Sequence, residues 1–163
     1  MKKASHGAAP ALEVERSLGP EASQTHIRFP FAVAAGAERL EVLFSYDPKI
    51  LADEARERAL VEEGLRTYAD SLDSDSNSDS AAGPPGRPRE PLNNLLTFSL
   101  DGPSGFRGCA HRHNPDQSIT IGGAAATPGF IPGALEEGPW TATVSVHCVV
   151  TDRCTFRLRV RVL

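Results

Sequence analysis

The residues best suited to metal chemistry are two histidines separated by one residue, in the run His111-Arg112-His113. A Zn²⁺ ion in a protein needs three or four ligands from His, Cys or carboxylate side chains. Only Asp116 follows close by, and the remaining histidines are scattered along the chain, at His6, His26 and His147. The spacing therefore favours a polar loop, and no metal site is expected.

A second set of potential metal ligands lies in an acidic run that starts with Asp73-x-Asp75-x-Asn77. An EF-hand calcium loop has this alternation, but it also needs glycine at the sixth position and a bidentate glutamate at the twelfth. Those positions hold Ser78 and Pro84. The run is therefore interpreted as a solvated acidic linker.

No group of residues has the composition of a nucleophilic catalytic site. The three cysteines are Cys109, Cys148 and Cys154. His147 precedes Cys148, but neighbouring residues of a strand point to opposite faces, so these two would not pair. The glycine-rich runs match neither a nucleophile elbow nor a P-loop. We therefore expect no catalytic residue, no cofactor and no enzymatic activity in this chain.

The best candidates for ligand binding lie in two segments rich in Gly and Pro, 101–115 and 122–139, which we expect to be long loops. Loops at the end of a sandwich often carry its binding site. The side chains expected to meet there are Phe106, Arg107, His111, His113 and Trp140. Arg107 would offer a planar fork of donors to a carboxylate, a phosphate or vicinal hydroxyl groups.

Two alternatives to this site stay open. Arg107 could tie its own loop down by donating to backbone carbonyl groups. Trp140, the only tryptophan, could cap one end of the core.

Three arginines, Arg157, Arg159 and Arg161, alternate along the last predicted strand and share its outer face. Charged side chains often protect an exposed sheet edge from pairing with another chain, and we prefer this interpretation. The alternative is a patch for an anion or an acidic partner. The formal net charge of −4 weakens that alternative, and no aromatic stacking platform accompanies the ladder.

Composition bounds the class of protein. A chain of 163 residues can build one core, and its 14 Gly and 13 Pro indicate many turns. With a net charge of −4 and no apolar run of about 20 residues, we expect neither a nucleic acid nor a membrane as partner. Residues 4–10 lack the apolar core of a secretory signal, and three cysteines without one indicate a cytoplasmic protein.

Alternating apolar residues predict an all-β fold, an antiparallel, jelly-roll-like β-sandwich of about seven strands in residues 25–163. The segment 1–24 is expected to be loosely ordered apart from a short edge strand near 11–16. Alternation is clean over 26–33, where Pro30 indicates an edge or a bulge. Further alternating strands are predicted at 38–46, 96–100 and 117–121.

The apolar spacing changes to three and four between Leu51 and Leu72, which predicts one inserted amphipathic helix over 48–71. Asp47-Pro48 would provide its N-cap and first residue. Residues 72–91 are rich in Asp and Ser and then in Gly and Pro. We expect them to form a disordered linker inside the domain.

The last two strands are the clearest elements, because apolar residues hold the even positions from Ala142 to Val150 and from Cys154 to Val162. If these strands pair as a hairpin, equal parity on one face requires a loop of odd length. A loop of residues 150–152, with Asp152 in the left-handed conformation, would make Cys148 and Cys154 neighbours on the core face. The competing loop, 151–153, would set Cys148 against Phe156.

Three short motifs carry a resemblance to a known family. They are Phe106-Arg107-Gly108, the run Ala126-Thr127-Pro128-Gly129-Phe130-Ile131-Pro132-Gly133, and Gly138-Pro139-Trp140-Thr141. Together with Phe29-Pro30-Phe31 and the run from Leu40 to Asp47, they resemble the β-sandwich domain that precedes the catalytic domain of CehA/McbA-type metallohydrolases, in the polymerase and histidinol phosphatase (PHP) superfamily.

The resemblance covers most of residues 26–162 and implies an accessory sandwich. In that family the metal ligands begin with an Asp-x-His-x-His motif downstream of the sandwich, where this sequence ends, so no catalytic residue is carried over. We therefore expect a non-catalytic accessory or ligand-binding module for a carbohydrate-like or other small polar ligand, or for a protein partner. The alternative is the accessory domain of a PHP-type phosphoesterase whose catalytic domain is on another chain or missing from this one.

Overall fold

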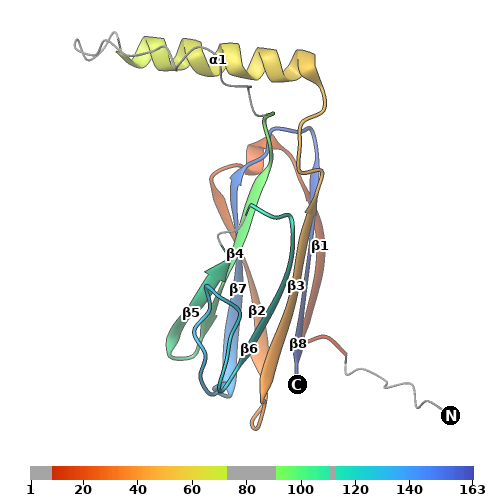
Figure 1. Cartoon of the computed structure of the whole chain (residues 1–163), viewed down its shortest axis with the longest axis vertical. Helices are drawn as coiled ribbons and strands as arrows, with labels where there is room; N and C mark the ends of the chain where they lie inside the picture. Colours follow the sequence, from red (N-terminus) through yellow and green to blue (C-terminus); the bar gives the residue numbers. More distant parts are fainter. Residues whose placement is uncertain (1–8, 73–90, 111–112) are drawn as a thin grey trace, which may run out of the picture.

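Alternating apolar strands build two facing antiparallel sheets in the computed structural model, which describes residues 9–72, 91–110 and 113–163, except for the side chains of 70–72 (Figure 1). Sheet A has the strand order β1-β8-β3-β6, and its strands are Leu12–Leu18, Cys154–Val162, Arg39–Asp47 and Asp116–Gly122. Sheet B has the order β2-β7-β4-β5, and its strands are Thr25–Val33, Gly138–Cys148, Leu95–Gly102 and Gly105–Ala110.

This strand order is that of a jelly roll. Among the described strands, only β4 and β5 are consecutive in the chain and also paired with each other. Every other connection crosses from one sheet to the opposite sheet. The predicted all-β, jelly-roll-like sandwich with one helix is confirmed, with eight strands in the described residues.

The core lies between the sheets and consists of the side chains that the alternation predicts. On β3, for example, Leu40, Val42, Phe44 and Tyr46 are all buried. The rings of Phe44 on β3 and Phe98 on β4 meet across the sandwich with centroids 5.1 Å apart. Because neighbouring residues of a strand alternate between faces, the odd-numbered side chains of β3 and β8 point outward from sheet A.

The N-terminal part of the sandwich is more ordered than the sequence suggested. In the segment 1–24, β1 is an edge strand of sheet A, as expected for residues 11–16, and a 3₁₀ turn, Pro20–Ala22, leads from it to β2. The strand β2, which contains Pro30, is the edge of sheet B. This position agrees with the prediction from the proline, which cannot donate a ladder hydrogen bond.

The helix begins later than predicted. The observed helix α1 is Glu54–Leu72, and Asp53 caps it by accepting hydrogen bonds from the backbone N–H groups of Ala55 and Arg56, each at 3.0 Å. Residues 48–51 run extended beside 92–94, where Leu51 N–H donates to Leu92 O and Asn94 N–H donates to Lys49 O. Asp47-Pro48 therefore lies at the end of strand β3 and does not cap the helix. The predicted linker 72–91 lies outside the described residues apart from its two ends.

The predicted C-terminal hairpin is wrong. Strand β7 lies in sheet B and β8 in sheet A, so the two strands face each other across the core instead of pairing. Their even-numbered side chains do point inward, but from opposite sides. The equal parity of the two strands therefore reflects two sheets that face each other, not a hairpin. Both registers that the hairpin allowed are excluded, and Cys148 and Cys154 are not cross-strand neighbours.

The predicted loop 101–115 is also wrong in its first half. Residues 105–110 form β5, which pairs with β4 through a tight turn at Pro103 and Ser104. The glycines at 102, 105 and 108 suggested a loop, but here they permit the turn and a close approach of the backbone. The second predicted loop is confirmed for residues 123–137, between β6 and β7.

Candidate functional site

Arg107 and Trp140, the two central members of the predicted ligand site, do meet. The guanidinium carbon of Arg107 lies 5.1 Å from the centroid of the Trp140 ring. Arg107 also donates hydrogen bonds to the carbonyl oxygens of Ala134, Gly133 and Ile131, at 3.0, 3.1 and 3.3 Å. These contacts correspond to the alternative in which Arg107 ties down the neighbouring loop.

Trp140 is fully buried at the start of β7. Its indole N–H donates to Glu136 O at 2.9 Å, and the ring lies against Gly102. No face of the ring is open to solvent, so Trp140 caps the end of the core and cannot serve as a stacking platform for a ligand.

The remaining predicted residues do not join this pair. Phe106 is 55% exposed and lies opposite Asp101 on the outer face of sheet B. His113 lies beyond the other end of β5, and the strand alone separates Phe106 from Ala110 by about 13 Å. His111 lies outside the described residues. Of the predicted side chains that the structure describes, Arg107 and Trp140 therefore lie together, whereas Phe106 and His113 lie apart from this pair.

The 123–137 loop closes one open side of the sandwich. It bonds to the edge of sheet A through Thr127 N–H and Thr120 O, and to the edge of sheet B through Cys109 N–H and Gly129 O. Two of its apolar side chains, Phe130 and Leu135, are buried in the core. A Cβ on Gly108 would lie 2.5 Å from Gly129 O, so only glycine permits this approach.

The motifs that carry the family resemblance therefore form one structural unit. Phe106-Arg107-Gly108 borders the run from Ala126 to Gly133, and Arg107 connects that run to Trp140. The described contacts of this unit are made within the unit itself. They explain the motifs by their role in folding and do not create a binding site.

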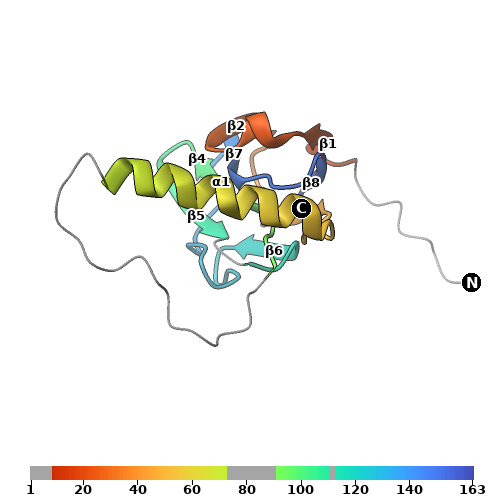
Figure 2. The ribbon, with the colours of Figure 1, turned by 90° about the horizontal axis from the view of Figure 1, so that it is seen from above.

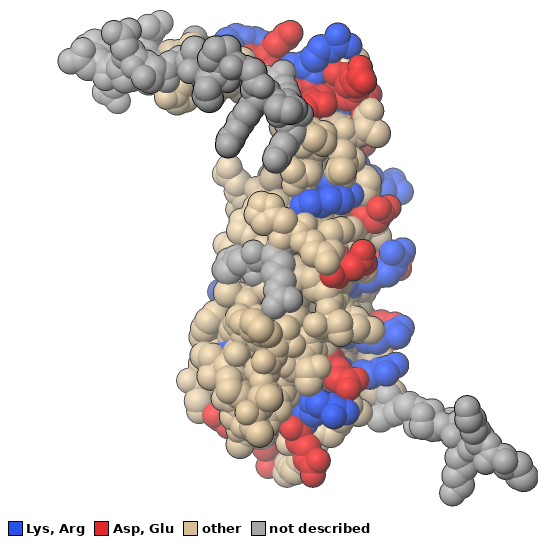
Figure 3. All heavy atoms as spheres, in the orientation of Figure 1, with Lys and Arg blue, Asp and Glu red and all other residues tan. Residues whose placement is uncertain are grey.

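A hollow on the surface lies elsewhere, on the outer face of sheet A. It is a groove of about 500 Å³ that crosses all four strands. Two rows of outward side chains border it: Glu15, Arg157, Ser45 and Asp116 in one row, and Glu13, Arg159, Leu43 and Ser118 in the next. Figure 3 shows Arg and Lys alternating with Asp and Glu down the side of the sandwich that carries β1, β3 and β8.

Two arginines of the predicted ladder, Arg157 and Arg159, line this groove. Arg157 Nε donates to Glu15 Oε2 at 2.7 Å, and Arg159 Nε donates to Glu13 Oε1 at 2.9 Å. Both pairs are exposed, so each contributes at most about 1 kcal/mol to stability. Edge protection is the wrong explanation for the ladder, because β8 lies inside sheet A and β1 covers its edge.

The groove also holds an apolar side chain and lies beside an unpaired donor. Leu43 is 48% exposed in the middle of the sheet, between Arg159 and Ser118. One row further along, Arg161 Nε is buried and has no hydrogen-bond partner among the described residues. A ligand in the groove could cover the leucine and meet charges of both signs.

The groove was not predicted, although the sequence contains one indication of it. Leu43 is an apolar residue on the polar face of an otherwise clean alternation, between Glu41 and Ser45. Its neighbours on the sheet lie near positions 15, 117 and 158 of the sequence. That these positions are adjacent to Leu43 can be seen only when the strand order is known.

The described residues contain no group of three or more His, Cys, Asp or Glu side chains arranged to hold a metal ion. No helix within the described ranges is long and apolar enough to span a membrane.

Comparison of the chain with protein-family models and with curated proteins gives no match. The family resemblance described above therefore rests on its motifs alone.

Proposed function

We propose that this protein is a non-catalytic accessory or ligand-binding β-sandwich module, and that the groove on sheet A is its binding surface. The observation that carries this proposal is a hollow of about 500 Å³ with a half-exposed leucine at its centre and charged side chains on both sides. Ligand sites combine an apolar floor with a few convergent polar groups in this way.

The side chains that line the groove restrict the classes of ligand that it can bind. Arg157 on β8 faces Asp116 on β6 across Ser45, and in the next row Arg159 faces Ser118 across Leu43. A small polar ligand that carries both signs of charge, or an extended segment of a protein partner, matches this arrangement. A carbohydrate-like ligand is less favoured, because the groove has no aromatic lining residue directed outward among the described residues.

A cytoplasmic location belongs to the same proposal. The three cysteines are free thiols, and a reducing compartment keeps thiols in this state.

Binding to the groove can be tested by placing a charge on its floor. Leu43→Glu should weaken binding of a ligand found in a titration screen of zwitterionic amino acids, dipeptides and short peptides by at least tenfold, or about 1.4 kcal/mol. The matched control is Thr143→Glu, which places the same charge at an outward position of a central strand in sheet B. Equal affinity in wild type and Leu43→Glu would contradict the proposal, as would equal losses in both variants.

A second candidate is the accessory domain of a PHP-type metallohydrolase. It is supported by the packing of three resembling motifs into one unit, since motifs that match by chance need not meet in space. The test is co-expression with a PHP catalytic domain encoded beside this gene, followed by size-exclusion chromatography and a phosphodiesterase assay. Separate elution of the two chains and unchanged activity on adding this protein would reject this function.

A further inference from the structure

The groove on sheet A runs across the strands, and its floor is backbone. The floor residues are Val14, Leu158, Phe44 and Gln117, which are register partners on the four strands and turn their side chains toward the core. The walls are the two rows of outward side chains, about 6.8 Å apart because they are two residues apart along each strand. From β1 to β6 the groove spans three strand spacings, or about 14 Å. These dimensions fit a narrow, extended ligand.

Polar recognition in this groove must come from the walls. Strands β8 and β3 lie inside sheet A, so their backbone N–H and C=O groups are taken by the ladder hydrogen bonds of the sheet. The floor therefore offers a ligand shape but few hydrogen bonds.

The arginines of the walls keep donors that the fold does not use. Among the described residues, Arg157 donates only through Nε, to Glu15, which leaves both of its Nη groups without a partner. Arg159 binds Glu13 through Nε and Nη2, which leaves Nη1. The two arginines stand on opposite walls above β8. A carboxylate that lies between them would accept charge-assisted hydrogen bonds from both.

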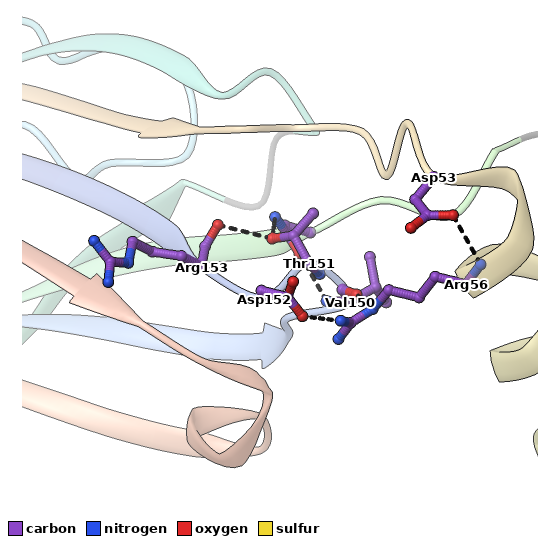
Figure 4. A network of polar contacts seen from close by, with 7 residues as sticks. Asp53, Arg56, Val150, Thr151, Asp152 and Arg153 are labelled. Atoms are coloured by element: carbon purple, nitrogen blue, oxygen red, sulfur yellow. Dashed lines mark hydrogen bonds and ion pairs between the residues drawn. The ribbon is translucent and has the colours of Figure 1, made fainter.

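Arg56 shows the opposite situation, in the polar network where α1 meets the β7–β8 connection. Its Nε donates to Val150 O at 3.0 Å, and its guanidinium forms an ion pair with Asp152 (Figure 4). These contacts hold α1 across the end of the sandwich (Figure 2), so this network supports the fold. The charged side chains of the groove connect strands that already pair through their backbones, and they are therefore more readily available to a ligand.

Asp116 supplies a negative charge at the β6 end of the groove. It takes part in no ion pair within the part of the chain that the structure describes. Its strand lies two strand spacings from β8, which is about 9.6 Å. Above β3, midway between the two, Leu43 forms one wall, and the short side chain of Ser45 leaves room opposite it. The groove thus presents, in order, two arginines, an apolar side chain and a carboxylate.

We propose, as an extension of the binding function above and resting on it, that the groove takes a free tripeptide with an apolar central residue. The carboxylate of the peptide lies between Arg157 and Arg159, its ammonium group lies beside Asp116, and its central side chain contacts Leu43. Because the charged groups stand in the walls, the ligand itself must span the distance between them. An extended chain of three residues is about 10 Å long, which matches this distance, whereas a dipeptide of about 7 Å is too short.

An NMR titration with the tripeptide Gly-Leu-Gly tests this ligand class. Acetylation of its amino group should weaken binding to wild type by about tenfold, through the loss of a charge-assisted hydrogen bond. The dipeptide Gly-Leu should show a similar loss. In Asp116→Asn, acetylation should make no difference, because the partner of the ammonium group is gone. Asp101→Asn is the matched control, since Asp101 is a carboxylate on the outer face of sheet B, and it should keep the tenfold difference.

Three results would each overturn this ligand class. One is equal binding of free and acetylated Gly-Leu-Gly to wild type, which would make an extended segment of a protein partner the better occupant. The second is an equal effect of acetylation in Asp116→Asn and in wild type. The third is a wild type that binds none of these peptides. None of them decides whether the groove is a binding surface, because the comparison of Leu43→Glu with Thr143→Glu tests that function with any ligand that binds.

Discussion

Arg107 shows how one side chain can fix a long loop. It donates to three successive parts of the 123–137 loop and lies against Trp140. We expect Arg107→Ala to lower the free energy of unfolding by about 2–4 kcal/mol, because three carbonyl groups lose a charged donor. Urea denaturation measures this loss. Arg107→Lys should recover only part of it, since an ammonium group lacks the planar fork. Unchanged stability in Arg107→Ala would show that the loop holds without it.

The thiol of Cys154 makes the free energy of unfolding depend on pH in the alkaline range. Burial, with the nearby Asp47 carboxylate, raises the pKa of this thiol from 9.0 to about 11. The folded protein thus favours the neutral thiol, which gives a stabilising contribution that is complete below pH 9 and is lost as pH rises through about 11. Urea denaturation at pH 8, 9 and 10 should therefore show a smaller decline in Cys154→Ala than in wild type. Equal slopes for the two proteins would refute the assignment.

At the scale of elements, the connection between β7 and β8 shows what pattern alone cannot decide. Both a hairpin and a crossing between sheets keep the even-numbered residues buried, so alternation does not distinguish them. The crossing is stabilised by the fully buried side chain of Asn94, which is far from this connection in the sequence. Its Oδ1 accepts from Val150 N–H at 2.7 Å, and its Nδ2 donates to Thr151 Oγ1 and Pro48 O, each at 2.8 Å.

Asn94 is therefore expected to be critical for this connection. Asn94→Ala should cost about 3 kcal/mol or more, because it leaves several buried polar groups without partners at once. The neighbouring variant Asn93→Ala, at a partly exposed position, should cost less than about 1 kcal/mol. Chemical denaturation of both variants checks the difference, and similar losses would mean that the connection does not depend on this amide.

At the scale of the whole molecule, the sequence predicts local features well and long-range pairing poorly. The alternation in β3, β4 and β8 correctly identifies the core side chains, and Pro30 correctly indicates an edge. The jelly-roll strand order depends on contacts between distant segments, as when β1 pairs with β8. Among the predicted site residues that the structure describes, Phe106 and His113 lie at different ends of β5, whereas the groove gathers residues from four separate strands.

The closing loop provides the last prediction, because it completes the sandwich between the edges of β5 and β6. Phe130 enters the core from this loop, and its ring centroid lies 5.7 Å from that of Phe98. Its neighbour Ile131 is 51% exposed. Phe130→Ala should cost about 3–5 kcal/mol, because it removes a buried ring and leaves a cavity between the sheets. Ile131→Ala, in the same loop, should cost less than about 1 kcal/mol.

Thermal and urea unfolding would measure both losses, and hydrogen exchange would locate them. In Phe130→Ala the backbone N–H groups of Cys109 and Thr127, which bond across the closure, should exchange faster than in wild type. Exchange at β1 and β2, on the opposite side of the sandwich, should rise only as far as the global loss of stability requires. If Phe130→Ala and Ile131→Ala lose equal stability, the loop merely covers the surface. Closure of the sandwich then depends on its backbone hydrogen bonds alone.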